Sequence, residues 1–147
     1  MKFFRLDPEA AGGLARMTVM DRSTHPPLVT RLHYEFDGWL GDELLQSFPC
    51  FIVTQALASS LAAADLTGTS FDLVIVTVSQ QFRDMYGDRA LPEFSWLKVC
   101  GRAGADDFGV DNNNYLVVSE RALRMMNLKH CIVQEWPAPS NGQGQPT

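Results

Sequence analysis

The sequence predicts an α+β fold, in which a mixed or antiparallel sheet carries a few helices packed on it. The order of the elements leads to this class, because strand-like segments come first, strand and helix alternate in the middle, and strands return at the end. No strand–helix–strand unit carries a glycine-rich phosphate loop. The length of 147 residues suits a single domain, which we place over residues 1–136.

The first third of the chain is predicted to hold two strands and a short helix. Residues 2–6 are mostly apolar and form the first strand, which the proline and glycines of residues 8–13 interrupt. Apolar and polar side chains alternate within residues 28–36, which predicts a strand with one buried face. Asp42 is expected to accept backbone N–H bonds at the start of a short helix that runs through Gln46.

The middle of the chain carries the strongest strand and helix signals. Residues 48–53 form a short apolar run around Pro49, which predicts an edge or irregular strand. Thr54 is a good N-cap for the alanine-rich helix expected over residues 55–64. Residues 71–78 are β-branched and nearly all apolar, so they are the best candidate for a central strand.

The last third is predicted to alternate again and to end in a tail. The expected elements are a helix over residues 80–85 capped by Ser79, a strand over 94–100, a polar loop over 101–114, a strand over 115–118, a helix from Ser119 to Met126 and a last strand over 131–136. Residues 137–147 are rich in Pro, Gly, Gln and Ser, which predicts a disordered tail.

Cysteine usage and hydropathy predict a soluble cytoplasmic protein. Cys50, Cys100 and Cys131 are far apart and odd in number, which is typical of free thiols in a reducing compartment. Cys50 and Cys131 lie in apolar runs and are expected to be small buried hydrophobes. The N-terminus lacks the apolar stretch of a signal peptide, and uncharged residues 47–64 have the period of a strand followed by a helix, so no membrane association is expected.

The charge of the chain is acidic and unevenly spread. The formal net charge is -5, and no basic run interleaved with aromatic residues occurs, which disfavours nucleic acid as a direct partner. No Lys or Arg stands between Arg31 and Arg83. This stretch is either a chance run of solvated acids or an acidic surface that steers a basic partner. Its six acids are Glu35, Asp37, Asp42, Glu43, Asp65 and Asp72.

No motif commits the chain to a chemical reaction. Asp106 and Asp107 stand in a loop that lacks the spacing of an EF-hand, so turn chemistry is favoured over a divalent cation site. His25, His33 and His130 do not stand beside a nucleophile in a recognisable motif. We therefore predict no catalytic residue, no metal ligand and no cofactor.

A group of acids around Trp39 is the most suggestive constellation, and two interpretations stay open. Paired carboxylates are the machinery of glycoside hydrolysis, but neighbouring acids are common on any acidic surface. Acids around an exposed aromatic residue also suit protein–protein recognition. Trp39 itself is either such an anchor or part of the core. The acids of this group are Glu35, Asp37, Asp42 and Glu43.

Four segments of the chain together carry a family resemblance. They are residues 51–57 (FIVTQAL), 94–99 (FSWLKV), 106–109 (DDFG) and 116–123 (LVVSERAL). Over roughly residues 2–136 the sequence resembles the small bacterial immunity proteins encoded beside polymorphic toxins, including effectors of type VI secretion; one such family was long described only as a domain of unknown function. The resemblance implies a cytoplasmic protein that binds a cognate toxin, and it implies no catalytic residue.

The predicted function is therefore that of an immunity protein, a protein–protein inhibitor that neutralises a cognate toxin and is not an enzyme. The acidic segment is compatible with a basic toxin, such as a nuclease domain. The predicted partner-binding residues are Glu35, Asp37, Trp39, Asp42, Glu43, Asp106 and Asp107. One alternative is a small hydrolase or transferase that uses the acids near Trp39 or at Asp106 and Asp107. Another is an assembly module that forms a homodimer.

Overall fold

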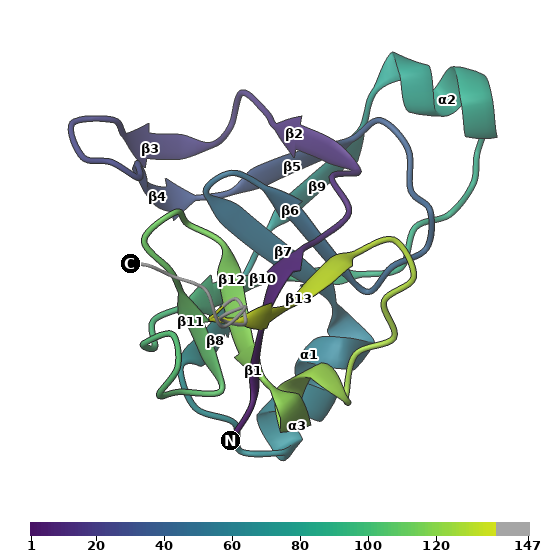
Figure 1. Cartoon of the computed structure of the whole chain (residues 1–147). Helices are drawn as coiled ribbons and strands as arrows, with labels where there is room; N and C mark the ends of the chain where they lie inside the picture. Colours follow the sequence, from purple (N-terminus) through teal and green to yellow (C-terminus); the bar gives the residue numbers. More distant parts are fainter. Residues whose placement is uncertain (138–147) are drawn as a thin grey trace, which may run out of the picture.

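The computed structural model describes residues 1–137 and has an α+β architecture, as the sequence predicts (Figure 1). Within these residues, thirteen strands form four sheets and are joined by three short helices. The helices are α1 (Gln55–Ala63), α2 (Gln80–Tyr86) and α3 (Glu120–Leu123). Residues 138–147, which make up most of the predicted tail, lie outside the described part of the chain.

Two four-stranded antiparallel sheets form the larger part of the fold. Sheet A has the order β11 (Phe108–Val110), β12 (Leu116–Ser119), β1 (Phe3–Asp7) and β13 (Ile132–Trp136). Sheet B has the order β6 (Leu44–Ser47), β7 (Cys50–Thr54), β10 (Phe94–Val99) and β8 (Thr69–Asp72).

Sheet C is smaller and mixed. It has the order β2 (Gly12–Leu14), β5 (His33–Phe36) and β9 (Ile75–Val78), with β5 and β9 parallel. A separate hairpin pairs β3 (Val19–Asp21) with β4 (Leu28–Arg31). Helix α2 follows β9 and stands out from the body of the molecule (Figure 1).

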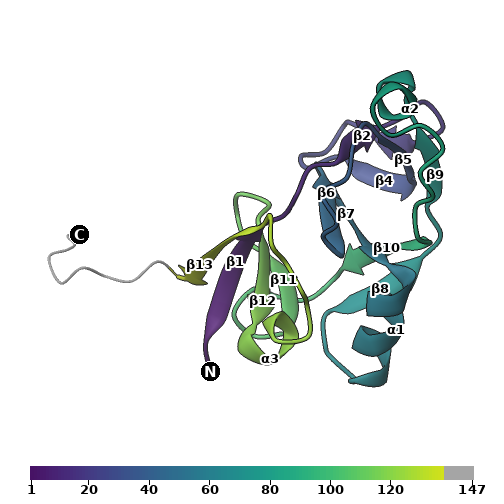
Figure 2. The same cartoon turned by 90° about the vertical axis from the view of Figure 1, so that its right-hand side faces the viewer.

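Sheet B is the middle layer, and its side chains alternate between two hydrophobic cores (Figure 2). In β7, Phe51 and Val53 belong to the core shared with sheet A, whereas Cys50 and Ile52 belong to the core shared with sheet C. Every residue of β7 is buried. A strand buried on both faces shows a continuous apolar run in place of alternation.

The helices begin where local capping chemistry predicts. The side chains of Thr54, Ser79 and Ser119 accept N–H bonds from Leu57, Phe82 and Ala122, each at 3.2 Å. Burial then fixes each helix, because α1 and α3 contribute to the core beside sheet A and Phe82 of α2 contributes to the core beside sheet C. The expected helix after Ser119 is shorter than predicted and ends at Leu123.

Two predictions about the N-terminal third are wrong. The expected helix from Asp42 to Gln46 is absent, since this segment enters strand β6 and pairs with β7. The first strand does end before Pro8, as predicted, but residues 12–14, expected to be part of the break, form strand β2, paired with β5. A Cβ atom on Gly12 would lie 1.8 Å from the carbonyl oxygen of Glu35, so glycine is required there by close strand approach and does not mark a break.

The expected central strand over residues 71–78 is also wrong. It divides into β8, at the edge of sheet B, and β9, at the edge of sheet C. Leu73, between them, is 88% exposed. A β-branched run predicts that a segment forms β-structure. It does not predict whether the segment belongs to one sheet or is divided between two.

Several other boundaries differ from prediction. The strand expected over residues 28–36 is two strands, β4 and β5, separated at Leu32. The strand around Pro49 was expected to be an edge or irregular strand, yet β7 is a regular internal strand and the proline lies in the turn before it. Strands β3 and β11 were not predicted. No helix in the described part of the chain is long and apolar enough to cross a membrane.

Candidate functional site

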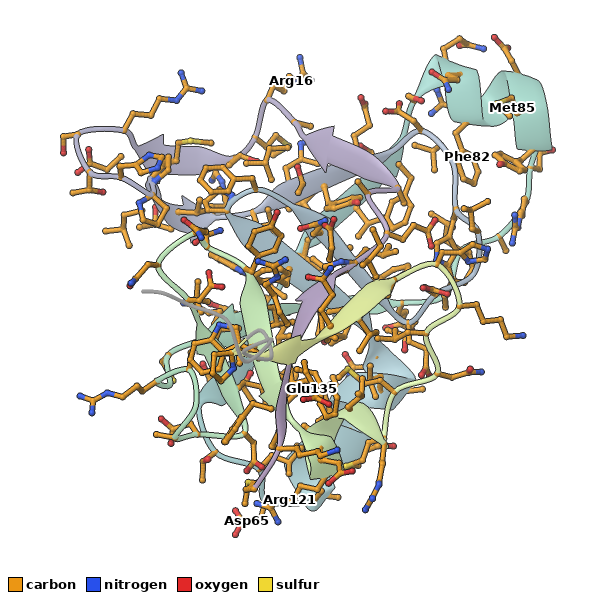
Figure 3. The ribbon with its side chains drawn as sticks, viewed as in Figure 1. Arg16, Asp65, Phe82, Met85, Arg121 and Glu135 are labelled. Atoms are coloured by element: carbon orange, nitrogen blue, oxygen red, sulfur yellow. The ribbon has the colours of Figure 1, made fainter. Side chains whose placement is uncertain are left out.

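The residues predicted to bind a partner fall into two groups at different ends of the molecule. Five belong to β5 or to the loop before β6, and two of these, Asp37 and Trp39, lie beside α2, whereas Asp106 and Asp107 precede β11. Figure 3 marks the separation, because Met85 of α2 lies at the upper right and Arg121, which binds Asp107, lies at the bottom. The seven predicted partner-binding residues therefore do not form one continuous surface.

Asp107 is a buried structural anchor. Arg121 donates two hydrogen bonds to its carboxylate, at 2.9 and 2.8 Å, Ser119 donates one at 2.6 Å, and the Thr67 N–H donates another at 2.9 Å. The Arg121 guanidinium holds the pKa of Asp107 well below its usual range, although burial of the carboxylate acts in the opposite direction. The neighbouring Asp106 accepts an N–H bond from Arg102 within the same turn.

Trp39 lies between the core and the surface. It is half-buried, its ring meets Phe94 edge-on at a centroid distance of 5.9 Å, and its Nε1 donates to the carbonyl oxygen of Asp42 at 3.0 Å. The Arg89 guanidinium lies 5.4 Å from the ring centroid, within cation–π range. Trp39 is therefore partly a core residue, and its role as a binding anchor stays a prediction.

Beside Trp39 the surface is hollowed between residues 37–40 and α2. We call this cavity, of about 330 Å³, the Trp39 hollow. Leu40 and Met85 at the hollow are each 62% exposed, although both are large apolar side chains. The lining also includes Glu9, Asp37, Trp39, Gln81 and Tyr86.

Asp37 and Glu35 are the members of the acidic group that keep solvent contact without a side-chain partner within residues 1–137. Asp37 is exposed and lines the Trp39 hollow, and Glu35 is half-buried in β5. Asp42 and Glu43, by contrast, bind the segment between α3 and β13. Asp42 is only 2% exposed and accepts N–H bonds from Lys129 and His130, and Glu43 accepts one from Asn127.

Two residues that were not predicted as site residues, Glu9 and His130, join Asp42 next to the hollow. The Glu9 carboxylate is buried and accepts N–H bonds from Leu40 at 2.7 Å and from Asp42 at 3.4 Å. The His130 Nδ1 atom lies 3.3 Å from Asp42 Oδ1. One ligand atom from each of Glu9, Asp42 and His130 lies within 4.8 Å of the others. We call these three residues the Glu9–Asp42–His130 cluster.

No sequence motif marks this cluster. Asp42 is 33 residues from Glu9 and 88 residues from His130, so the three residues share no helix or strand. Two pairings bring them together. Strand β1 pairs with β13, and Glu9, after β1, forms an isolated bridge with Leu45 of β6. Of the three, only Asp42 was predicted as a site residue, both as a partner-binding residue and as a helix cap. His130 was considered as a catalytic histidine and set aside, and Glu9 was not singled out.

The remaining candidate nucleophiles and bases have structural positions. Burial raises the pKa of the Cys50 thiol to about 12 and that of Cys131 to about 11, which disfavours the reactive thiolate at neutral pH. Cys50 is buried, as expected, whereas Cys131 is only partly buried. His33 is buried, and its Nε2 lies 2.7 Å from the Thr77 hydroxyl.

The Trp39 hollow and the Glu9–Asp42–His130 cluster are adjacent, because Glu9 contributes to both. They are the strongest candidates for a functional site among the described residues. Comparisons of the chain with known protein families and with curated proteins find no match. The function is accordingly inferred from the geometry and from the resemblance described above.

Proposed function

We propose that this protein is a bacterial immunity protein that binds a cognate toxin and neutralises it, with the Trp39 hollow as the centre of the interface. The observation that carries the proposal is the pair of exposed apolar side chains, Leu40 and Met85, beside a half-buried tryptophan. The resemblance of the sequence to immunity proteins of polymorphic toxins supports the same role.

The chemistry of the hollow suits a protein partner. Interfaces concentrate binding energy in aromatic and aliphatic anchors that fill pockets and are surrounded by a polar rim. The hollow is lined by the aromatic rings of Trp39 and Tyr86, by apolar Leu40 and Met85, and by the exposed carboxylate of Asp37. An apolar side chain of the toxin is expected to enter the hollow while a basic group meets Asp37.

Only Asp37 and the overall charge of the chain favour a basic partner. On α2 and its C-terminal turn, exposed Asp84 and Asp88 are balanced by exposed Arg83 and Arg89. The net charge of -5 adds a long-range attraction for a cationic toxin. Such charges accelerate association and make it sensitive to salt. Asp42 and Asp107 are buried, so in this proposal neither carboxylate contacts the toxin.

The proposal is tested by mixing the full chain with the toxin encoded by the neighbouring gene. A stoichiometric complex is expected in gel filtration, and Met85→Asp is expected to weaken it by about tenfold or more, because an anchor is replaced by a charge. Leu28→Asp is the matched control, since Leu28 is 59% exposed but lies in β4, away from α2 (Figure 1). Absence of a complex, or equal weakening by both variants, would refute the proposal.

The second candidate, a small hydrolase or transferase, is favoured by one observation. Glu9, Asp42 and His130 gather next to the hollow, where a substrate could reach them. Titrating the toxin with this protein separates the two functions. A binding protein abolishes toxin activity only near a 1:1 ratio, whereas an enzyme that modifies the toxin does so at far lower ratios.

A further inference from the structure

We infer that Glu9, Asp42 and His130 form a binding site for one divalent transition-metal ion, of the class that includes Zn²⁺, Mn²⁺ and Co²⁺. This site goes beyond the proposed function and does not depend on it. It would join three distant segments: the chain after β1, the loop before β6 and the connection from α3 to β13.

The charge balance of the cluster is the first argument. The Glu9 and Asp42 side chains belong to residues only 8% and 2% exposed, and their carboxylates lie within 4.8 Å of each other. Buried charges are costly unless an opposite charge compensates them. Within residues 1–137, Glu9 makes no ion pair and Asp42 pairs only with His130. Two buried carboxylates therefore face one imidazole, and a divalent cation supplies the missing charge.

The ligand types are the second argument. Carboxylate oxygens and an imidazole nitrogen are the ligands that Zn²⁺ and related divalent transition metals take in open sites, where water completes the coordination. An all-oxygen site would favour Mg²⁺ or Ca²⁺ instead, so the imidazole selects for transition metals.

The backbone around the cluster holds the ligands in place. The Leu40 N–H binds Oε2 of Glu9 at 2.7 Å, whereas Oε1 has only a long contact, 3.4 Å, from the Asp42 N–H. The Lys129 and His130 N–H groups bind one oxygen each of Asp42. Each carboxylate oxygen keeps a lone pair for a metal, and such outer hydrogen bonds orient ligands in known metal sites.

The cluster is open to solvent on one side. The His130 side chain is 41% exposed, and Glu9 also lines the Trp39 hollow. Metal bonds of about 2.0–2.2 Å require the three ligand atoms to move closer together than they are now. The imidazole of His130 can make this movement, because it belongs to an irregular segment and not to a strand.

The test measures metal binding by the full, untagged chain. Titration calorimetry with Zn²⁺ is expected to give one ion per chain, and His130→Gln and Glu9→Gln are each expected to weaken binding by at least about tenfold. His25→Gln is the control, because His25 is an exposed histidine in the loop between β3 and β4. Mg²⁺ is expected to compete poorly.

The cysteines require a separate control, because thiolates also bind Zn²⁺. Cys131 follows His130 directly and Cys100 is exposed. The titration is therefore repeated in the Cys100→Ser, Cys131→Ser background, where binding is expected to persist. Co²⁺ substitution is expected to give d–d absorption without sulfur charge-transfer bands.

Three results would overturn the inference: no Zn²⁺ binding by the wild-type chain, binding that survives His130→Gln unchanged, or binding that disappears with the cysteines. Circular dichroism checks each variant for folding. If Glu9→Gln does not fold, His130→Gln carries the decision, because its side chain is partly exposed and its backbone N–H bond to Asp42 is retained.

Discussion

Asp42 and Asp107 are two buried loop aspartates with opposite surroundings. Asp107 faces the Arg121 guanidinium and accepts hydrogen bonds from Ser119 and Thr67, so its charge is fully compensated. Asp42 also accepts N–H bonds, from Lys129 and His130, but it faces a second carboxylate, Glu9, and a partly exposed histidine in place of an arginine. Burial alone therefore does not show whether the charge of an aspartate is balanced. The positive groups and hydrogen-bond donors around its carboxylate decide that.

The largest expected effect is the loss of the Asp107 anchor. Asp107→Ala is expected to lower the free energy of unfolding by about 3 kcal/mol, because it removes the hydrogen bonds that the buried carboxylate accepts and leaves the buried Ser119 hydroxyl without its acceptor. Urea denaturation measures this loss. Asp106→Ala, next to it in the sequence, is expected to cost below about 1 kcal/mol, since its carboxylate accepts one exposed turn bond. Similar losses for both variants would break the contrast.

The same carboxylate is expected to make stability depend on acid. Because the folded-state pKa of Asp107 is lowered, its contribution is complete above the unfolded-state value of about 3.9 and is lost as the pH falls below it. Unfolding free energies measured from pH 7 to pH 2 are expected to fall more steeply for the wild type than for Asp107→Asn. Parallel curves for the two proteins would contradict the assignment.

A smaller effect is expected from Arg121→Lys. The lysine keeps the positive charge but cannot reproduce the paired bonds from Nε and Nη2 to the two carboxylate oxygens. The expected loss is smaller than that of Asp107→Ala, because the Arg121 side chain is 56% exposed and water screens the pair. Arg124→Lys is the control, since Arg124 makes only an exposed helical pair with Glu120. Thermal unfolding compares the two variants.

The smallest effect is expected at Asp42, despite its deeper burial. In metal-free buffer, Asp42→Ala is expected to cost below about 1 kcal/mol. The freed N–H groups belong to exposed Lys129 and His130, which can bind water, and the repulsion from Glu9 disappears. Chemical denaturation in the presence of a chelator tests this. A loss as large as that of Asp107→Ala would show that Asp42 is a structural anchor too.

The sequence predicted the parts of the fold that depend on neighbours along the chain. Thr54, Ser79 and Ser119 were identified as caps and begin helices, because a cap binds an N–H group three residues away. The predicted helices at α1 and α2 and the strands at β1, β10 and β13 are confirmed. The α+β class follows from the order of these elements.

The sequence was less informative about the candidate site. It identified Trp39 and Asp37, which line the hollow, because aromatic and acidic residues cluster there along the chain. It did not identify Met85 of α2, because the local sequence does not show that this helix residue is exposed in the folded protein. The sequence also did not predict that Asp106 and Asp107 lie far from the Trp39 group in the structure, because distance along the chain does not give distance in space.

The amino-acid sequence by itself determined composition, charge, helix starts and the α+β class, since each of these rests on local or additive properties. Only the tertiary structure decided which acids are exposed, that Gly12 lies in a strand against Glu35, and that Glu9 and His130 meet at Asp42. These features depend on sheet pairing between segments many residues apart. A local pattern fixes a helix cap but carries no record of which distant strand will lie beside it.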